Sequence, residues 1–399
     1  MTRIEPVTET ADCIPIVLFG SGEFAVGPFE LLRARLPELG VTIVQVISQP
    51  DRKAGRGRES LATPVSVWAI AHGIPLLRTP DVNEPATLEM IRQLDARLFV
   101  VIAFGQKMSD ALLENVAAIN LHGSILPRWR GAAPIQRSVM AGDAKVGVSV
   151  IGLSERMDAG SVFATAQTDL IPTETAGDLH DRLSTLGAIP LFETVARWVS
   201  AFRAEATSSQ SRSTRSCRAL EALGGETQDE SLATRARKLS RADAWVDFTC
   251  SAGEVCARIN GLSPWPGVDA MIGSEPARLL RARVAEANPS IRAIPGEVGA
   301  DGLVGCGTGS IELLEVQAPG SRVTSLGAFM NGRRMSMGIR IESNHPNHPN
   351  HPKSQSSRSA CSISTVRGES LARSACVATL QLVHLKQRVR SRVERCRGK

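Results

Sequence analysis

Two short stretches of the sequence carry polar side chains suited to acyl transfer. The first runs over residues 120–137 and reads NLHGSILPRWRGAAPIQR. Asn120 and His122 stand two residues apart at the predicted end of a strand, so both side chains project from the same side of it. The second stretch, LSERMDAGSV, follows another predicted strand and places Asp158 between Met and Ala-Gly. An amide, an imidazole and a carboxylate together can stabilise an oxyanion and move protons.

A purely structural interpretation stands beside each of these residues. Asp-x-Gly often marks only a turn, and a single His is more often structural than catalytic. His72 precedes a Gly at a predicted helix end and His180 lies in a helical DLHDRL, so we interpret both as structural. The sequence has no G-x-S-x-G nucleophile elbow and no Cys placed as a nucleophile. The pattern around His122 therefore favours acyl transfer without a covalent enzyme intermediate.

The elements that must position these residues alternate between strands and helices. Thr63 before Pro64 predicts a helix start. Thr175 with Asp178 resembles a capping box and predicts a helix to about Phe202. Short apolar runs rich in β-branched residues predict strands at residues 14–20, 41–48, 98–105, 116–123 and 146–153. This alternation predicts an α/β fold with a doubly wound, mostly parallel sheet, whose ligands bind beyond the carboxyl ends of the strands.

The pattern changes in the second half of the chain. Residues 206–216, ATSSQSRSTRS, are rich in Ser and Arg without periodicity, which predicts an interdomain linker. Beyond about Lys238, short segments punctuated by Gly and Pro predict a small β-barrel. Its candidate strands are WVDFT, ARLLRARVAEA, GEVGADGLVGC and SIELLEVQ, with one helix in AGEVCARINGL. The predicted parts are an N-terminal extension (1–13), a catalytic domain (14–203), a linker (204–229), a C-terminal barrel (230–343) and a basic low-complexity tail (344–399).

The formal net charge of +6 is concentrated at the C-terminus. Residues 344–399 hold eleven Lys or Arg against two Glu, a balance of +9, so the first 343 residues carry about −3. The tail opens with NHPNHPNHP, which predicts a disordered spacer or, alternatively, a weak metal site. It ends in LKQRVRSRVERCRGK, a solvated end or a nonspecific RNA-binding arm. The overall charge therefore does not by itself indicate a nucleic-acid partner.

The spacing of the Cys residues and the hydropathy of the chain indicate the cellular compartment of the protein. The eight Cys residues are spread along the chain without a C-x-x-C pair, which fits neither a zinc site nor a disulfide framework. No run approaches ~18 consecutive apolar residues, and the N-terminus MTRIEPVTETADC lacks the apolar segment of a secretory signal. We expect a soluble cytoplasmic protein with no membrane association and no bound metal.

The stretch NLHGSILPRWRGAAPIQR with a downstream Asp-x-Gly resembles the signature of the folate-dependent formyltransferases. Three further segments resemble the branch of that family that acts on charged tRNA. They are its inserted tRNA-contacting loop (QPDRKAGRGRESLATPV, 49–65), its folate-side strand and loop (VVIAFGQKMSD, 100–110) and the helix closing its catalytic domain (ETAGDLHDRL, 174–183). RKLSRADAWVDF, INGLSPWPG and LLEVQAPG match its C-terminal barrel in order. The resemblance covers about residues 14–343.

The resemblance implies a Rossmann-like formyltransferase domain followed by an OB-like β-barrel that binds tRNA. It implies transfer of the formyl group from 10-formyltetrahydrofolate to the methionine α-amino group of initiator methionyl-tRNA. A free α-amino group has a pKa of ~7.7–8.0, so a usable fraction is neutral at pH 7 and can attack the formyl carbon directly. Folate is a co-substrate in this scheme, no metal takes part, and we expect a monomer.

The family's functional residues fall on positions of this sequence that match its motifs. Asn120 and His122 would donate hydrogen bonds to the oxyanion, and Asp158 would orient His122 and support its protonated form. The implied folate-contacting residues are Phe104, Gly105, Gln106, Ser124, Ile125, Leu126 and Pro127. The implied tRNA-contacting residues are Arg52, Lys53, Arg56 and Arg58, four cations within seven residues.

Some positions depart from the family pattern, and other functions stay open. Lys53 stands where the family commonly has proline, and ERMDAGSV around Asp158 differs from the usual Gly-Leu-Asp-Thr-Gly. Met108 and Ser109 replace a typical Leu-Pro. The same catalytic trio could formylate another amine, such as an amino sugar or a purine precursor. A formyl-folate hydrolase and a non-catalytic RNA-binding protein are the remaining alternatives.

Overall fold

The computed structural model describes residues 13–54, 59–205, 212–286 and 294–343. The N-terminal extension up to residue 12 and the predicted tail 344–399 lie outside the described residues.

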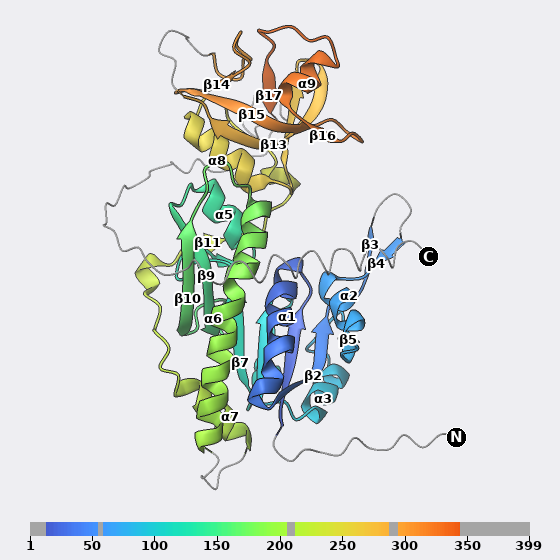
Figure 1. The fold of residues 1–399 in the computed structure, drawn as a ribbon, viewed down its shortest axis with the longest axis vertical. Coiled ribbons are helices and arrows are strands. Elements are labelled where there is room, and N and C mark those ends of the chain that lie inside the picture. Colours follow the sequence, from blue (N-terminus) through green and yellow to red (C-terminus); the bar gives the residue numbers. More distant parts are fainter. Residues whose placement is uncertain (1–12, 55–58, 206–211, 287–293, 344–399) are drawn as a thin grey trace. The chain divides into compact units, whose positions relative to one another are not determined.

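A seven-stranded sheet organises the N-terminal half, in the order β10-β9-β7-β6-β1-β2-β5 (Figure 1). Its strands are β1 (Ile14–Gly20), β2 (Val41–Ser48), β5 (Leu76–Arg78), β6 (Leu98–Ile102), β7 (Ala117–His122), β9 (Lys145–Gly152) and β10 (Val162–Asp169). The first five run parallel, whereas β9 is antiparallel to both β7 and β10. The predicted doubly wound, mostly parallel sheet is confirmed. From β1 the chain adds β2 and β5 on one side, and it then returns to add β6 on the other side of β1. The order of the strands therefore reverses between β1 and β6. Such sheets bind ligands at this switch point, beside the carboxyl ends of the two strands.

Strand alternation divides the apolar side chains between the two faces of this sheet. Ile16 and Leu18 of β1 join one core cluster, and Val17 and Phe19 join the other. The helices that contribute to the first cluster are α1 (Val26–Arg35), α2 (Pro64–Ala71), α5 (Pro134–Met140), α6 (Ala176–Ala204) and α7 (Arg212–Glu221). α3 (Pro85–Gln93) and α4 (Asp110–Leu113) contribute to the second.

Two helix starts predicted from the sequence are confirmed. At α2, Thr63 Oγ1 accepts a hydrogen bond from the Ser66 amide at 3.1 Å, ahead of Pro64. At α6, Thr175 and Asp178 form a capping box, with amide-to-side-chain distances of 3.0 and 3.2 Å. These side chains pair amides that a helix start otherwise leaves without partners.

The C-terminal half is built on an antiparallel sheet in the order β14-β15-β13-β12-β17, with β16 paired to β15 (Figure 1). Its strands are β12 (Val268–Ile272), β13 (Glu275–Val284), β14 (Val304–Gly305), β15 (Ser310–Gln317), β16 (Val323–Thr324) and β17 (Ile341–Ser343). Helices α8 (Ala252–Leu262) and α9 (Leu326–Asn331) bury apolar side chains in its core. The predicted small β-domain is therefore confirmed, in the form of a half-barrel.

One strand prediction in this half is wrong, and a second holds only in part, because GEVGADGLVGC (296–306) forms β14 and isolated bridges at Glu297 and Val298 rather than one strand. WVDFT, residues 245–249, is not a strand, although Val246 and Phe248 are buried in the core of the half-barrel. The Asp247 carboxylate accepts hydrogen bonds from the amide and hydroxyl of Thr249, which turns the chain back on itself. Alternating burial alone cannot distinguish such a segment from an edge strand.

The segment interpreted as a linker holds a packed helix. α7 begins inside residues 206–216, and its Ser216 and Ala219 are fully buried. Ser216 Oγ accepts from the Ala117 amide at 3.0 Å and donates to the Arg97 carbonyl, so α7 is attached to the start of β7. The Arg215 guanidinium lies 4.0 Å over the Phe202 ring. Ser and Arg side chains, which look like linker composition in the sequence, here make tertiary contacts.

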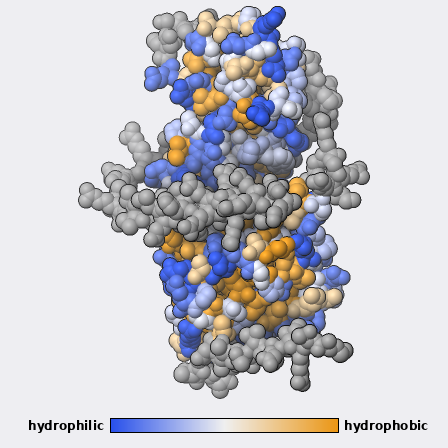
Figure 2. Space-filling view, turned by 45° about the vertical axis from the view of Figure 1, so that its right-hand side comes forward, coloured by the Kyte–Doolittle hydropathy of each residue, from blue (hydrophilic) through white to orange (hydrophobic). Residues whose placement is uncertain are grey.

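The surface of the α/β half exposes several large apolar side chains. They include Leu61, Val67 and Ile70, and Met90 on α3. Figure 2 shows apolar residues gathered on the side of the molecule on which α2 and α3 lie. In the part of the chain that the structure describes, no helix is both long and apolar enough to cross a bilayer.

Candidate active site

Asn120 and His122 lie at the carboxyl end of β7, on the face opposite α6. Their neighbours Ile119 and Leu121 belong to the core cluster that contains α6, whereas Ala118 belongs to the other cluster. Asn120 is half-buried, and among the described residues no hydrogen bond involves its side-chain amide. The two amide N–H groups are therefore available to a bound molecule.

Both ring nitrogens of His122 face hydrogen-bond acceptors. Nε2 lies 2.9 Å from the Trp129 carbonyl oxygen, and Nδ1 lies 3.6 Å from Asp158 Oδ2. Because a carbonyl oxygen only accepts, Nε2 must carry a proton in this hydrogen bond, while Nδ1 faces the Asp158 carboxylate. The 3.6 Å separation is too long for a hydrogen bond but short enough for charge attraction. An N–H at Nδ1 can therefore also donate to a substrate oxygen.

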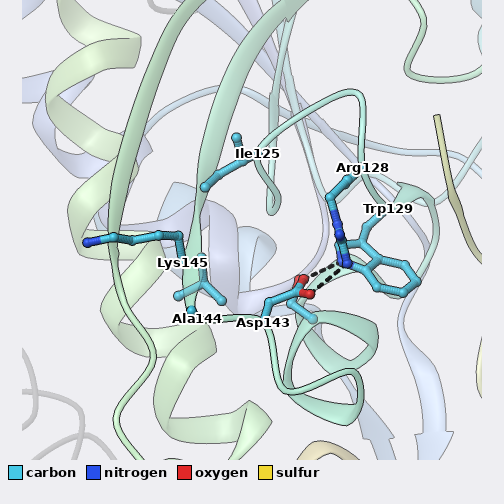
Figure 3. A pocket seen from close by; sticks show the side chains of 8 residues that line it. Ile125, Arg128, Trp129, Asp143, Ala144 and Lys145 are labelled. Carbon is cyan, nitrogen blue, oxygen red and sulfur yellow. Dashed lines mark hydrogen bonds and ion pairs between the residues drawn. The ribbon is translucent and has the colours of Figure 1, made fainter. Parts of the chain in front are cut away.

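A hydrogen bond from the indole ring fixes the position of Trp129. Trp129 Nε1 donates to Asp143 Oδ2 at 2.6 Å, and Arg128 Nη2 donates to Asp143 Oδ1 at 2.6 Å (Figure 3). Burial raises the pKa of the Asp143 carboxyl above its usual value, and the Trp129 hydrogen bond and the Arg128 charge oppose that rise only in part. The Trp129 backbone has φ +64°, a left-handed conformation unusual for a large side chain. The anchored ring holds this turn so that its carbonyl faces His122.

Asp158 also has a left-handed backbone, with φ +54°. Its carboxylate accepts a hydrogen bond from the Gly131 amide at 2.8 Å, which holds it beside His122. Packing requires a glycine at position 160 of the Asp-x-Gly motif, because a Cβ on Gly160 would lie 1.9 Å from the Gly152 carbonyl oxygen. Gly131 likewise has no room for a side chain, with φ +126° and the Ala236 carbonyl 2.6 Å from the position of a Cβ.

The segment that follows α7 completes the surroundings of this pair. β11 (Arg235–Ala236) pairs in parallel with β8 (Arg130–Gly131). Gln228 is buried and donates to the carbonyls of Asp158 and Gly160. Sequence reasoning missed Gln228 because it lies in the predicted linker, 70 residues from Asp158. No local pattern around it signals this role.

Residues 104–106 follow β6 near the switch point. The buried Phe104 presents its carbonyl oxygen to Ser21 Oγ at 3.1 Å and to Gln49 Nε2 at 2.7 Å. Gly105 has φ +77°, and a Cβ there would lie 2.5 Å from Gln49 Nε2. The Gln106 side chain bonds to the Val82 amide at 2.7 Å and the Thr79 carbonyl at 2.8 Å. Gln106 thus stabilises the loop, and its amide is already engaged by the backbone.

Residues 124–127 form a second rigid loop. Ser124 Oγ donates to the Arg128 carbonyl at 2.7 Å, and Ser149 Oγ bridges the Ser124 carbonyl at 2.9 Å and the Leu126 amide at 3.1 Å. Ile125 lines a cavity of about 280 Å³ beside Trp129 and Asp143 (Figure 3). His122 and Asn120 do not line this cavity.

Two of the four predicted tRNA-contacting cations, Arg52 and Lys53, lie on a short strand. β3 (Arg52–Ala54) and β4 (Glu59–Leu61) form an antiparallel hairpin. Arg52 is exposed and donates to Gln49 Oε1. Lys53 lies within β3, whereas Arg56 and Arg58 lie outside the described residues.

Comparison with known proteins decides the family. The formyl transferase family model matches residues 14–195, and the model of the formyl transferase C-terminal domain matches residues 238–334. A methionyl-tRNA formyltransferase of Roseobacter denitrificans is 37% identical over 326 residues, which cover 81% of this chain and 97% of that relative. The chain belongs to the formyltransferase family.

Other formyltransferases and one larger protein are also similar to the chain. A methionyl-tRNA formyltransferase of Stutzerimonas stutzeri is 37% identical over 325 residues, covering 80% of this chain and 95% of the relative. The crystal structure of HypX from Aquifex aeolicus in complex with tetrahydrofolic acid matches 80% of this chain and 47% of its own, with a TM-score of 0.51 and 16% identity. At that identity the structural likeness shows a shared fold only. This formyltransferase thus spans about half the length of HypX.

Proposed function

We propose that this formyltransferase transfers the formyl group of 10-formyltetrahydrofolate to the methionine α-amino group of initiator methionyl-tRNA. The observation that carries the proposal is the 3.6 Å approach of His122 Nδ1 and Asp158 Oδ2, with the unengaged amide of Asn120 on the same strand as His122. The near-full-length similarity to two relatives named methionyl-tRNA formyltransferase supports this acceptor.

The proposed reaction needs no covalent enzyme intermediate. The neutral amine attacks the formyl carbon, a new N–C bond forms, and the carbonyl oxygen becomes an oxyanion. The Asn120 amide and the Nδ1–H of His122 donate to that oxyanion, and the Asp158 carboxylate stabilises the protonated ring. The bond from the formyl carbon to N10 then breaks, and one proton passes from the attacking amine to N10, with water as the relay.

We place the folate co-substrate at the loops 104–106 and 124–127. Hydrogen bonds from residues such as Gln49 and Ser149 hold the backbone of both loops in place. Gly105 lets the loop 104–106 take a left-handed backbone against the Gln49 side chain, which leaves no room for a Cβ there. The loop 104–106 follows a strand at the switch point, the usual ligand position in such sheets.

We place the acceptor arm of the tRNA at the β3–β4 hairpin. Arg52 and Lys53 lie on its first strand, and in the sequence Arg56 and Arg58 follow them within five residues. Four closely spaced cations can approach the phosphates of an RNA end and make binding depend on salt. The half-barrel, within the second family match, supplies a further surface for the tRNA.

The deciding experiment offers several acceptors to the purified full chain. With 10-formyltetrahydrofolate, we expect formylated methionyl-tRNA from initiator tRNA and no product from amino-sugar nucleotides or purine-precursor amines. Preference for one of those amines would overturn the acceptor assignment. Formate release without any acceptor would indicate a hydrolase. RNA binding without formyl transfer, unchanged in His122→Ala, would indicate a binding protein.

A further inference from the structure

The Asp158 turn is held by a residue far from it in the sequence. Asp158 has φ +54°, a conformation that costs free energy for any residue except glycine, so surrounding contacts must maintain it. The Asp158 carbonyl accepts a hydrogen bond from Gln228 Nε2 at 2.8 Å, and the Gly160 carbonyl accepts from the same nitrogen at 2.7 Å. The two N–H groups of one amide thus hold both sides of the turn.

The orientation of the Gln228 amide is set by a buried charge. Gln228 Oε1 accepts from Arg130 Nε at 3.0 Å and from Arg130 Nη2 at 2.8 Å. A guanidinium has only donors, so the amide oxygen must face Arg130 and the amide nitrogen must face the two carbonyls. Gln228 is 7% exposed and Arg130 is 9% exposed, so water does not compete strongly for these groups.

The charge of Arg130 is balanced nearby. Glu230 accepts from Arg130 Nη1 at 3.1 Å and from Nη2 at 3.0 Å, and it also bonds to Arg156 at 2.5 Å. These hydrogen bonds lower the pKa of Glu230, so it stays ionised and keeps the buried guanidinium compensated. Arg156 precedes Asp158 by two residues, so the network contacts both ends of the turn.

The same stretch of chain also holds the turn at Trp129. We call residues 226–236 the bridging segment. Its Glu226 exchanges two backbone hydrogen bonds of 2.8 Å with Val162. Its Thr234 Oγ1 accepts from the Trp129 amide at 2.9 Å, and its β11 pairs with β8. The bridging segment therefore positions the Trp129 carbonyl and the Asp158 turn, the two groups that face the nitrogens of His122.

We infer that Gln228 is a positioning residue for Asp158, through which the bridging segment holds the carboxylate beside His122. The bridging segment ends just before residue 238, where the match to the C-terminal domain begins. The inference rests on the proposed function, because it assigns Gln228 a part in the same reaction.

The test is a double-mutant cycle on the full chain. Gln228→Leu should lower kcat for formyl transfer about 10- to 100-fold, because misplacing a catalytic group by about 1 Å costs up to ~10²-fold. KM values for methionyl-tRNA and 10-formyltetrahydrofolate should stay within twofold of wild type. In an Asp158→Asn background, Gln228→Leu should cause no further loss, since its effect passes through Asp158. Gln93→Leu, at an exposed position of α3, is the matched control and should behave as wild type.

A second variant, Gln228→Glu, distinguishes a loss of positioning from misfolding of Gln228→Leu. It keeps the side-chain length and the contact with Arg130 but removes the N–H groups that bond to the two carbonyls. It should lower kcat by a similar factor, and a cooperative thermal unfolding transition, even at a lower midpoint, shows that the variant is folded. A kcat equal to wild type in both variants, or additive losses in the cycle, would overturn the inference.

A second readout does not need catalysis. The ring nitrogens of ¹⁵N-labelled His122, assigned by loss of the signal in His122→Gln, should shift in Gln228→Leu and not in Gln93→Leu. An unchanged spectrum would overturn the inference even if formyl transfer is seen. If wild type transfers no formyl group but the His122 signal shifts as expected, the proposed function fails and the positioning role stands.

Discussion

His122 is the residue on which the site converges. Its Nε2 is bonded to a carbonyl whose own turn is held by the Trp129–Asp143 hydrogen bond, and its Nδ1 faces a carboxylate held by the Gly131 amide. The ring is 6% exposed, so its orientation is set by these contacts rather than by solvent. A preorganised donor of this kind loses little free energy to reorganisation when an oxyanion forms.

Asn120→Ala should lower kcat about 10²- to 10³-fold, the usual cost of removing one oxyanion donor, ~2.7–4 kcal/mol. The fold should be unaffected, because within the described residues the Asn120 amide bonds to no other group. Steady-state kinetics together with thermal unfolding checks both points. Asn331→Ala, an exposed asparagine at the end of α9, is the control, and near-wild-type turnover in Asn120→Ala would refute the assignment.

At the scale of elements, the start of α6 connects the two halves of the described chain. Arg281 of β13 donates to Asp178 Oδ2 at 2.6 Å and to the Thr173 carbonyl at 2.9 Å. Burial raises the pKa of Asp178, but the hydrogen bonds from Arg281 and Thr175 outweigh it, so the pKa lies below its usual value. The ionised carboxylate therefore stabilises the folded state more than the unfolded one.

Asp178→Asn should reduce the thermal unfolding midpoint at pH 7 by no more than about 3 °C, since Asp178 is partly exposed and solvent screens the pair. A lowered folded-state pKa gives stability that is present above the unfolded pKa and is lost as the pH falls through the folded value. The difference between wild type and variant should therefore shrink in acid. Unfolding midpoints from pH 7 to pH 3 test this, with Glu193→Gln on α6 as control. A difference that stays constant with pH would contradict it.

The β3–β4 hairpin is the element assigned to tRNA. Replacing Arg56 and Arg58 by Ala should raise the KM for charged tRNA several-fold and leave the KM for folate unchanged. Each lost phosphate contact should reduce the slope of log affinity against log salt by roughly 0.7–0.9. The double variant Arg35→Ala/Arg92→Ala, which removes exposed cations of the α/β half, is the matched control. The same KM at two salt concentrations as in wild type would count against the hairpin.

At the scale of the whole molecule, the charge is divided between a slightly acidic body and a tail with a balance of +9. The family matches end at residue 334, before the tail begins. A chain ending at Ser343 should therefore keep kcat and KM within twofold of the full chain, as formylation kinetics would show. A large rise in the KM for tRNA would instead make the tail an RNA-binding arm.

The sequence predicted five of the seven strands of the first sheet and two helix starts, because those depend on neighbours a few residues away. Strand alternation placed Asn120 and His122 on one face of β7, and Thr63 and Thr175 marked helix starts through side chains that bond three residues ahead. The strand expected at residues 245–249 was wrong, because an Asp247–Thr249 turn replaces it.

Local patterns in the sequence determined the α/β fold, the half-barrel and the residues with suitable chemistry. Only the tertiary structure decided which contacts hold the catalytic residues in place. α7 and the bridging segment look like a linker in sequence, yet they bring Gln228 to Asp158 across 70 residues. The physical reason is that these contacts arise when β11 pairs with β8, about 100 positions earlier in the chain, and no periodicity in the sequence encodes such a pairing.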